Sequence, residues 1–517
     1  MTRREALLAT LSLTALTVTD GPIRAAVPGG RNGGQNSGGL PGPTPFDGNT
    51  VREIARAIAQ EPYKAPPEDL PREIADLSYD QYRDIRFNVD RSFWRPQKLP
   101  FEMQLFHRGF LYKPKIDIYD VAAGQANPVL YDPALFSFQN LQRPEPGNLG
   151  FAGFRLHAPL NRPDYYDEVC SFLGASYFRA VAKSQIYGLS ARGLAIGTGD
   201  QKGEEFPLFR AFWVERPREG VNAAQVHALL DSPSCSAAFR FAIRPGESTI
   251  FDVETSIFPR QDMATAGIAP LTSMFWFSPL NATGRDEWRP AVHDSDGLLM
   301  ATGRGERIWR PLNNPRDLQI SYFGDVNPRG FGLMQRRRDF ASYEDLEARY
   351  ERRPSLWIEP IGDWGEGVVQ LVEIPTQGEI HDNIVAFWRP KAPLRAKAEY
   401  RFTYRMHWCD EAPKVPQLGR ITMARSGANF QRDGRQVVLE VTGGALESLP
   451  EDAKPELSVS TDRGQIRNPV VHRNRESGGW RISFELHPGN ERVAELRVDL
   501  KHNERPVAET MLYRWTA

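Results

Sequence analysis

The sequence has few cysteines and little net charge. It holds three cysteines among 517 residues, Cys170, Cys235 and Cys409, and no two of them form a CxxC pair. A metal or redox framework built on cysteine is therefore not favoured, and buried or unpaired thiols are the simpler interpretation. The net charge of −1, with a pI near 6.8, offers nothing that would draw the chain to nucleic acid or to anionic lipid.

Several signatures of catalysis are also missing. The sequence has no GxxxxGK[ST] phosphate loop, no GxSxG nucleophile elbow and no HExxH zinc motif. Its histidines do not cluster at the spacing of metal ligands. The glycine-rich stretch at 193–199 lacks the helix that a dinucleotide site needs after it. We expect no metal and no cofactor, which leaves carboxylates and aromatic side chains as the candidates for chemistry.

Residues 1–26 have the pattern of an export signal. Arg3 and Arg4 precede an apolar run that ends near Val18, and Ala26 offers a small-residue cleavage site. The run is shorter than the roughly 20 apolar residues that span a bilayer, and no second apolar stretch approaches that length. The paired arginines predict a twin-arginine signal, with an ordinary Sec signal as the alternative, so we expect the protein in the periplasm.

The body of the chain is predicted to be β structure. From Arg86 onward, short runs rich in β-branched and aromatic residues alternate with clusters of Gly, Pro and Asn, as strands that end in turns do. Helical periodicity is scarce. One helix is predicted near Thr50, with Thr50 and Glu53 as a capping box, and a second, polar one over 343–349. The predicted fold class is all-β, with a sandwich architecture.

Shifts in composition divide the chain into segments. Residues 27–45, rich in Gly, Pro and Asn, predict a flexible leader after the signal peptide. A large β-sandwich is predicted over 46–409, and the stretch 410–418, with two prolines, is predicted to be a linker. Residues 419–517 contain about seven short strand-like runs, a count that predicts a C-terminal immunoglobulin-like sandwich.

Many aromatic residues lie beside polar and charged residues in turn-like segments. This mixture suits sugar binding, because a pyranose packs its apolar face on a ring while charged groups bind its hydroxyls. Wide β cores need aromatic residues as well, and composition does not decide between the two interpretations. The candidates are Trp276, Trp288, Trp309, Tyr350, Trp357, Trp364 and Trp388.

Two acidic clusters stand at predicted strand ends, HDSDG at 293–297 and EIHDN at 379–383. Glycoside hydrolysis needs two carboxylates, one to protonate the leaving oxygen and one to activate water or attack. Either cluster could equally be an Asx turn, in which the carboxylate bonds to its own backbone. Spacing alone leaves both interpretations open.

Longer motifs extend these clusters. They are FLGASYFRAVAKSQIYGLSARGLAI at 172–196, EWRPAVHDSDGL at 287–298, and a block at 310–388 that includes ARYERRPSLWIEPIGDWGEGVVQ and ends in EIHDNIVAFW. In this order they closely resemble the osmoregulated periplasmic glucan biosynthesis proteins G and D. The similarity runs from about Phe93 to Trp515. Within this family, a twin-arginine signal favours the D member over the G member.

The resemblance implies a fold and a site. The large domain should be similar to galactose-mutarotase-like sandwiches, and the C-terminal domain should be immunoglobulin-like. The family's catalytic pair matches Asp382 as general acid and Asp294 as general base. Tyr350 and Arg353 match positions that line the glucan. Three further residues in the same motifs are candidates for substrate binding, namely Trp357, His293 and Asp296.

The function implied by the resemblance is control of the glucose backbone of osmoregulated periplasmic glucans, by inverting cleavage or transfer on β-1,2-glucan. An inverting enzyme separates its carboxyl groups by roughly 6.5–9.5 Å to admit water, and by more if a relay carries the proton. The alternative is a non-catalytic glucan-binding scaffold that assists a membrane glucosyltransferase. A homodimer is plausible, and no nucleic-acid partner is expected.

Overall fold

The computed structural model describes residues 42–67, 69–144, 149–282, 286–413 and 418–517. The predicted signal peptide and all but the last four residues of the predicted leader lie outside these ranges. Within them, no helix is both long and apolar enough to cross a membrane.

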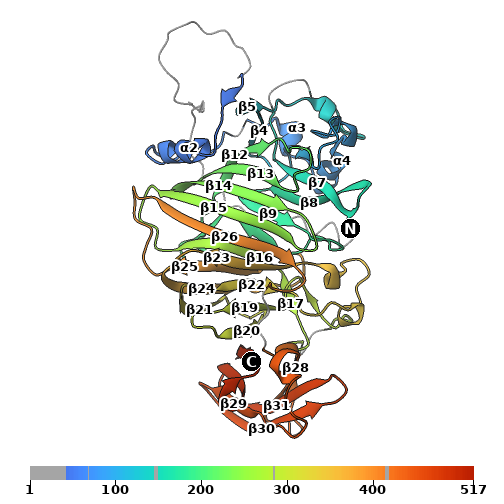
Figure 1. Ribbon diagram of the computed structural model, residues 1–517, viewed down its shortest axis with the longest axis vertical. Helices are drawn as coiled ribbons and strands as arrows, with labels where there is room; N and C mark the ends of the chain where they lie inside the picture. Colours follow the sequence, from blue (N-terminus) through green and yellow to red (C-terminus); the bar gives the residue numbers. More distant parts are fainter. Residues whose placement is uncertain (1–41, 68, 145–148, 283–285, 414–417) are drawn as a thin grey trace.

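Two large sheets dominate the molecule (Figure 1). The first has sixteen strands, which follow one another across the sheet as β1 (Thr44–Pro45), β5 (Gln125–Pro128), β4 (Asp117–Ala122), β12 (Leu208–Glu215), β13 (Ala224–Asp231), β14 (Cys235–Arg244), β15 (Thr249–Pro259), β26 (Tyr400–Cys409), β23 (Ser355–Ile361), β22 (Gly330–Met334), β19 (Gly297–Ala301), β20 (Arg307–Pro311), β34 (Thr510–Thr516), β32 (Val493–His502) and β29 (Glu456–Thr461), with β33 (Arg505–Pro506) paired to β32.

The second sheet has ten strands. They are β21 (Gln319–Val326), β24 (Glu366–Glu373), β25 (Ile384–Pro390), β16 (Ala266–Ser273), β10 (Ser190–Arg192), β9 (Tyr177–Ala180), β8 (Tyr165–Leu173), β7 (Gly153–Arg162) and β3 (Glu102–Phe106), with β11 (Leu194–Ile196) paired to β16. Two short pairs complete this part of the chain, β2 (Arg86–Phe87) with β6 (Phe136–Ser137), and β17 (Phe275–Phe277) with β18 (Val292–His293).

Aromatic side chains fill the space between the two sheets. Phe172 of the ten-stranded sheet lies 5.4 Å from Phe241 of the sixteen-stranded sheet, measured between ring centroids. Phe178 and Phe251 lie 6.0 Å apart across the same interface, and Trp408 stands 4.6 Å from Phe251. All five side chains are buried. The predicted β-sandwich is therefore confirmed, and these rings belong to its core.

In the described part of the chain, helices are few and short. They are α2 (Thr50–Ile58), α3 (Arg72–Ala75) and α4 (Tyr79–Asp84), with 3₁₀ turns η1 (Val89–Arg91), η2 (Pro133–Leu135), η3 (Phe340–Ser342), η4 (Tyr350–Arg352) and η5 (Gly444–Leu446). The predicted helix at Thr50 is confirmed, but its predicted capping box is wrong. Instead, Asp47 Oδ1 accepts from the backbone N–H groups of Asn49 and Thr50, at 2.9 and 3.0 Å.

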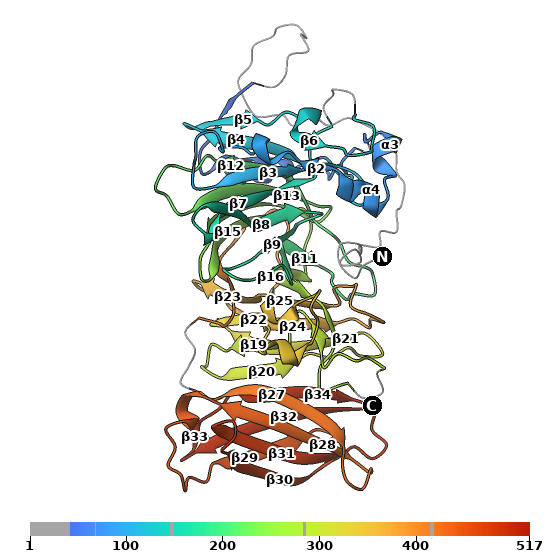
Figure 2. The same cartoon turned by 90° about the vertical axis from the view of Figure 1, so that its right-hand side faces the viewer.

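All seven strands predicted in the C-terminal segment are present. β29, β32 and β34 form one layer, and a four-stranded sheet forms the other, in the order β27 (Arg420–Ala428), β28 (Arg435–Thr442), β31 (Gly479–His487) and β30 (Gln465–Asn474). One feature was not predicted. β34 pairs in parallel with β20, which joins the first layer to the large sheet, as the stacked tiers of Figure 2 show.

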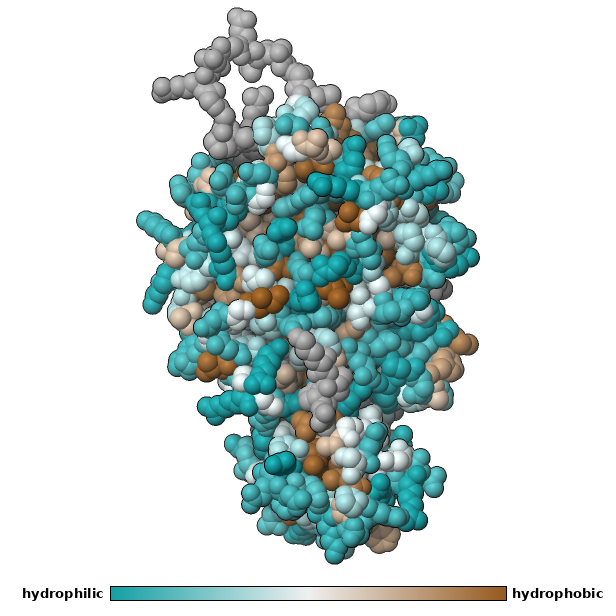
Figure 3. All heavy atoms as spheres, in the orientation of Figure 1, coloured by the Kyte–Doolittle hydropathy of each residue, from teal (hydrophilic) through white to brown (hydrophobic). Residues whose placement is uncertain are grey.

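A shared apolar core holds the two domains together. Trp309 and Trp357 of the large sheet belong to the same buried cluster as Ile421, Leu496 and Met511 of the C-terminal domain. The face of the molecule shown in Figure 3 carries mostly hydrophilic side chains, with apolar atoms in small separate groups. The two largest apolar clusters lie inside the chain, one between its two large sheets and one at this junction.

Substitution of Gly332 on β22 would test how closely β22 lies against β23. A Cβ atom at Gly332 would lie 2.4 Å from the carbonyl oxygen of Leu356, which is backbone and cannot move cheaply. We expect Gly332→Ala to lower the free energy of unfolding by about 1–3 kcal/mol through overpacking, measured by urea denaturation. Gly324→Ala is the matched control, because an added methyl group there meets open space on β21. Equal stability of the two variants would contradict this packing.

Candidate active site

Asp294 lies where the chain crosses from one sheet to the other. It directly follows β18, whose His293 pairs with Phe275 of β17, and it precedes β19 of the sixteen-stranded sheet. Its backbone N–H donates to the carbonyl of Met274 at 2.8 Å. The hydroxyl group of Ser295, the next residue, lies 2.8 Å from that of Ser273 at the end of β16. These contacts hold the aspartate between the ends of the two sheets.

The Asp294 carboxylate is buried and ion-paired. Arg353 Nη1 donates to Asp294 Oδ1, and the two side chains are only 5% and 3% exposed. Burial raises the pKa of Asp294, the nearby Asp382 carboxylate raises it further, and the Arg353 guanidinium opposes the increase. The result is a carboxylate whose pKa lies above its usual range, held in one orientation by a buried cation.

Arg353 is oriented by the irregular segment before it. Its guanidinium stacks on the Tyr350 ring, with 4.4 Å from Cζ to the ring centroid, and its Nε donates to the carbonyl of Ala348 at 3.2 Å. The prediction of a helix over 343–349 is wrong. Asp345 Oδ1 accepts from the N–H of Ala348 at 2.8 Å, and Arg349 adopts a left-handed φ of 46°, so the segment forms turns instead.

Asp382 lies in the loop between β24 and β25. Its side chain is 34% exposed and lies 3.9 Å from Arg179 Nη2, on β9. The neighbouring Asn383 is buried, and its side-chain amide binds both backbone groups of Phe275, at 2.8 and 3.0 Å. Because Phe275 belongs to the hairpin that leads to Asp294, Asn383 fixes the two acidic loops to each other.

A second buried cation organises the loops around this pair. Arg289 binds both carboxylate oxygens of Glu287, at 2.9 and 3.0 Å, and its Nη1 donates to Asp345 at 2.9 Å and to Glu379 at 2.6 Å. The Tyr350 hydroxyl donates to the same Glu379 oxygen at 2.8 Å. We call these four charged residues the Arg289 cluster. It joins the loop of Asp382 to the segment that orients Arg353.

His293 is fully buried beside Asp294. Its Nε2 lies 3.1 Å from the guanidinium of Arg337, which can only donate, so Nε2 accepts and Nδ1 donates to Gln335 Oε1 at 2.8 Å. Burial lowers the pKa of His293 to about 4. Asp296 lies 3.7 Å from Nε2 and is partly exposed. The imidazole is thus neutral and acts here as a fixed hydrogen-bonding group.

Trp357 does not lie among the residues that surround Asp294 and Asp382. Its ring covers Gly330, where an added Cβ would lie 2.1 Å from the indole, and it belongs to the core shared with the C-terminal domain. Its neighbour Leu356 faces the sandwich core instead. Because side chains alternate across a strand, Trp357 points away from the sandwich interior.

The aromatic candidates divide by burial. Trp309, Tyr350, Trp357, Trp364 and Trp388 are buried, which favours core packing for these five. Trp288 is 64% exposed, next to Arg289, and remains a candidate sugar platform. All three cysteines are buried and unpaired, as expected.

Sequence reasoning gave no individual role to four residues at this site, although two of them belong to the acidic cluster at 379–383. They are Arg179, Arg289, Glu379 and Asn383. Each lies within or beside a quoted motif, but nothing in spacing shows that their partners come from other loops. Among the described residues, no group of three or more His, Cys, Asp or Glu is arranged to hold a metal ion.

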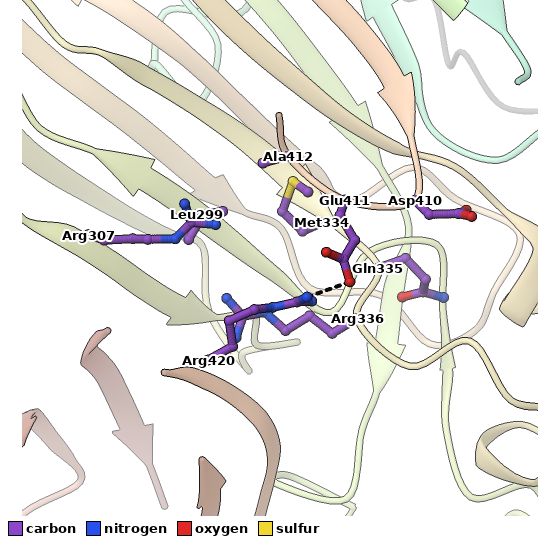
Figure 4. Close-up of a pocket in the computed structure, with 9 residues that line it drawn as sticks. All are labelled: Leu299, Arg307, Met334, Gln335, Arg336, Asp410, Glu411, Ala412 and Arg420. Carbon is purple, nitrogen blue, oxygen red and sulfur yellow. Dashed lines mark hydrogen bonds and ion pairs between the residues drawn. The ribbon is translucent and has the colours of Figure 1, made fainter. Parts of the chain in front are cut away.

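Two small pockets lie at the junction of the two domains. Figure 4 shows one of them, which is lined by Leu299, Arg307, Met334, Gln335, Arg336, Asp410, Glu411, Ala412 and Arg420. The other includes Asp296 and Arg337. The region next to His293 therefore borders the C-terminal domain.

Comparison with known proteins identifies the family of this chain. Residues 46–515 match the family model described as "Periplasmic glucan biosynthesis protein, MdoG". The chain belongs to the periplasmic glucan biosynthesis protein family. It is similar to proteins named "Glucans biosynthesis protein G" from Rhodopseudomonas palustris (strain BisA53), at 56% identity over 92% of this chain and 94% of the relative, and from Bradyrhizobium diazoefficiens, at 54% over 91% and 93%.

A relative in Vibrio cholerae with the same name is 52% identical over 91% of this chain and 87% of its own length. Membership of the family, its periplasmic location and its part in glucan biosynthesis are confirmed. The preference for the D member is corrected, since these relatives all carry the name G. That preference depended on the export signal, which lies outside the described residues.

The low pKa of His293 predicts acid sensitivity. Its folded pKa is about 4, whereas an unfolded histidine titrates near 6.5. Between these values the unfolded chain binds more protons, so stability is lost as pH falls from 6.5 towards 4, by about 3 kcal/mol for this residue. Urea denaturation across this range should show a shallower pH dependence for His293→Asn than for the wild type.

The buried His107, whose pKa burial also lowers to about 4, should keep part of the pH dependence in that variant. Identical pH dependence in the wild type and His293→Asn would contradict a neutral, buried His293.

Proposed function

We propose that this protein acts on β-1,2-glucan by inverting cleavage or transfer, with Asp382 as general acid and Asp294 as general base. One observation carries the proposal most directly: two acidic loops from different parts of the chain are held together by Asn383, so that Asp382 raises the pKa of Asp294. The motifs shared with the glucan family supply the substrate class, and a twin-arginine signal fits a protein that folds before export.

The exposure of the two carboxyl groups suits different roles. Asp382, 34% exposed, can reach the glycosidic oxygen of a bound glucan and protonate it as the C1–O bond breaks. Water, or a sugar hydroxyl in transfer, attacks C1 from the opposite face and gives up its proton. Asp294 is too buried to touch bulk solvent, so that proton would reach it through water or substrate hydroxyl groups.

The raised pKa of Asp294 fits the role of a base. Catalytic bases work best when their pKa approaches the working pH, and burial moves that of Asp294 in this direction. Arg353 keeps the carboxylate oriented and stabilises its charged form before the reaction. In this proposal Tyr350, Arg353 and His293, all buried, support the pair, and Asp296 and Trp288 are left to contact glucan.

The alternative is a non-catalytic protein that binds glucan and presents it to a membrane glucosyltransferase. The buried ion pair of Asp294 and Arg353 would then be structural. Product formation separates the two functions, because a scaffold binds glucan without changing it.

Asp382→Asn is the decisive variant. Without a proton donor, turnover of linear β-1,2-glucan should fall by roughly 10²–10⁴-fold, since general acid–base catalysis contributes about that much. Products are followed by chromatography and NMR, which also distinguishes cleavage from transfer. The side chain is partly exposed, so the thermal midpoint should stay within about 2 °C of the wild type.

Asp317→Asn provides the control. It makes the same chemical change at an exposed position before β21 and should leave turnover unaltered. Unchanged turnover in Asp382→Asn would remove Asp382 from catalysis. Glucan binding by the wild type without any product would favour the scaffold instead.

A further inference from the structure

Four consecutive residues, 335–338, leave β22 and contact three parts of the molecule. Gln335 binds the His293 ring at 2.8 Å, and its Nε2 donates to the carbonyl groups of His293 and Tyr350 at 2.9 and 3.2 Å. Arg337 binds the other nitrogen of the same ring at 3.1 Å. This segment therefore holds the residue next to Asp294 from two sides.

Arg338 binds the backbone of Arg353, the partner of Asp294 in the buried ion pair. Its Nη1 donates to the carbonyl of Arg353, and its Nη2 donates to Ser355 Oγ at 2.9 Å and to the carbonyl of Asp410 at 3.1 Å. The backbone at Arg353, and with it the guanidinium that binds Asp294, is thus fixed by the same short segment.

Arg336 binds the C-terminal domain. Its Nη2 lies 2.7 Å from Glu509 Oε2, and neither side chain is more than 4% exposed. Arg307 Nε donates to the other oxygen of Glu509 at 2.8 Å, and the Arg336 guanidinium lies 3.6 Å from the Trp309 ring centroid. Glu509 also accepts from the N–H of Ile421 at 3.3 Å.

These contacts are mechanically linked. Neighbouring Cα atoms are about 3.8 Å apart, so Arg336 cannot shift without moving Arg337 and the residues beside it. Glu509 is the only acidic side chain that an ion pair joins to Arg336 among the described residues. Without its charge, two guanidinium groups would be buried with no anion between them, and they would separate.

We propose that Glu509 of the C-terminal domain is a positioning residue for the Asp294–Arg353 pair, acting through residues 336–338. This role rests on the function proposed above. It makes the C-terminal domain part of the catalytic machinery, because its docking sets the geometry of a site that contains none of its own residues.

Glu509→Gln tests the proposal with an isosteric change. We expect kcat on linear β-1,2-glucan to fall by roughly 10–100-fold, the effect of displacing reacting groups by about 1 Å, while KM changes little. Hydrogen–deuterium exchange supplies a second measurement that needs no activity. Peptides covering 292–296 and 350–353 should exchange faster, while peptides from β13 and β14 should be unchanged.

Glu306→Gln is the matched control. Glu306 also joins the two domains, through Arg497 at 2.6 Å and Thr510 at 3.1 Å, but it does not contact residues 336–338. It should alter neither kcat nor the exchange at 292–296. If Glu509→Gln does not fold, Arg336→Lys replaces it, since a lysine keeps the charge but loses the fork that spans Glu509 and the Ile421 carbonyl.

Wild-type exchange and kcat in the folded Glu509→Gln or Arg336→Lys variant would overturn the proposal. So would equal effects of the Glu509 and Glu306 variants. If the wild type itself forms no product from glucan, the proposed catalytic function fails, and the exchange of 292–296 and 350–353 still decides whether Glu509 positions the pair.

Discussion

The ion pair between Asp294 and Arg353 is the interaction on which the candidate site depends. Each charge is removed from water, so each needs the other, and a buried charge that has lost its partner strongly destabilises a fold. The partners come from different segments, one after the β17–β18 hairpin and one before β23. Satisfying this pair therefore forces two loops that are far apart in sequence into one arrangement at the ends of both sheets.

Charged groups and neutral amide groups have different roles around that pair. Charged groups set protonation: the Asp294 pKa is raised by burial and by Asp382, and Arg353 opposes the increase. Neutral amide groups fix the spacing between neighbouring segments, since Asn383 and Gln335 each bind backbone atoms of another segment. A carboxylate in place of either amide could not donate, which explains why amides occupy these two buried positions.

Sequence patterns predicted the strands well because alternation and turn residues are local properties. All seven C-terminal runs, and the sandwich itself, follow from them. The errors have non-local causes. The polar run at 343–349 resembles a helix, yet the Asp345 side chain binds the N–H of Ala348, which a helix over this range would use for the carbonyl of residue 344. Long-range packing also decides where Trp357 lies: it shares a motif with the site, and its ring is in the core shared with the C-terminal strands. The partners of Arg289 and Asn383 are set by topology.

The parallel pairing of β34 with β20 has a consequence for biosynthesis. β34 lies at residues 510–516, about 200 residues after β20, so the edge of β20 stays open until that later segment has been synthesised. An open strand edge in a wide sheet is a template for association with other chains. Extension of the large sheet past β20 therefore waits for β34, and chains cut short before β34 would present that edge to one another.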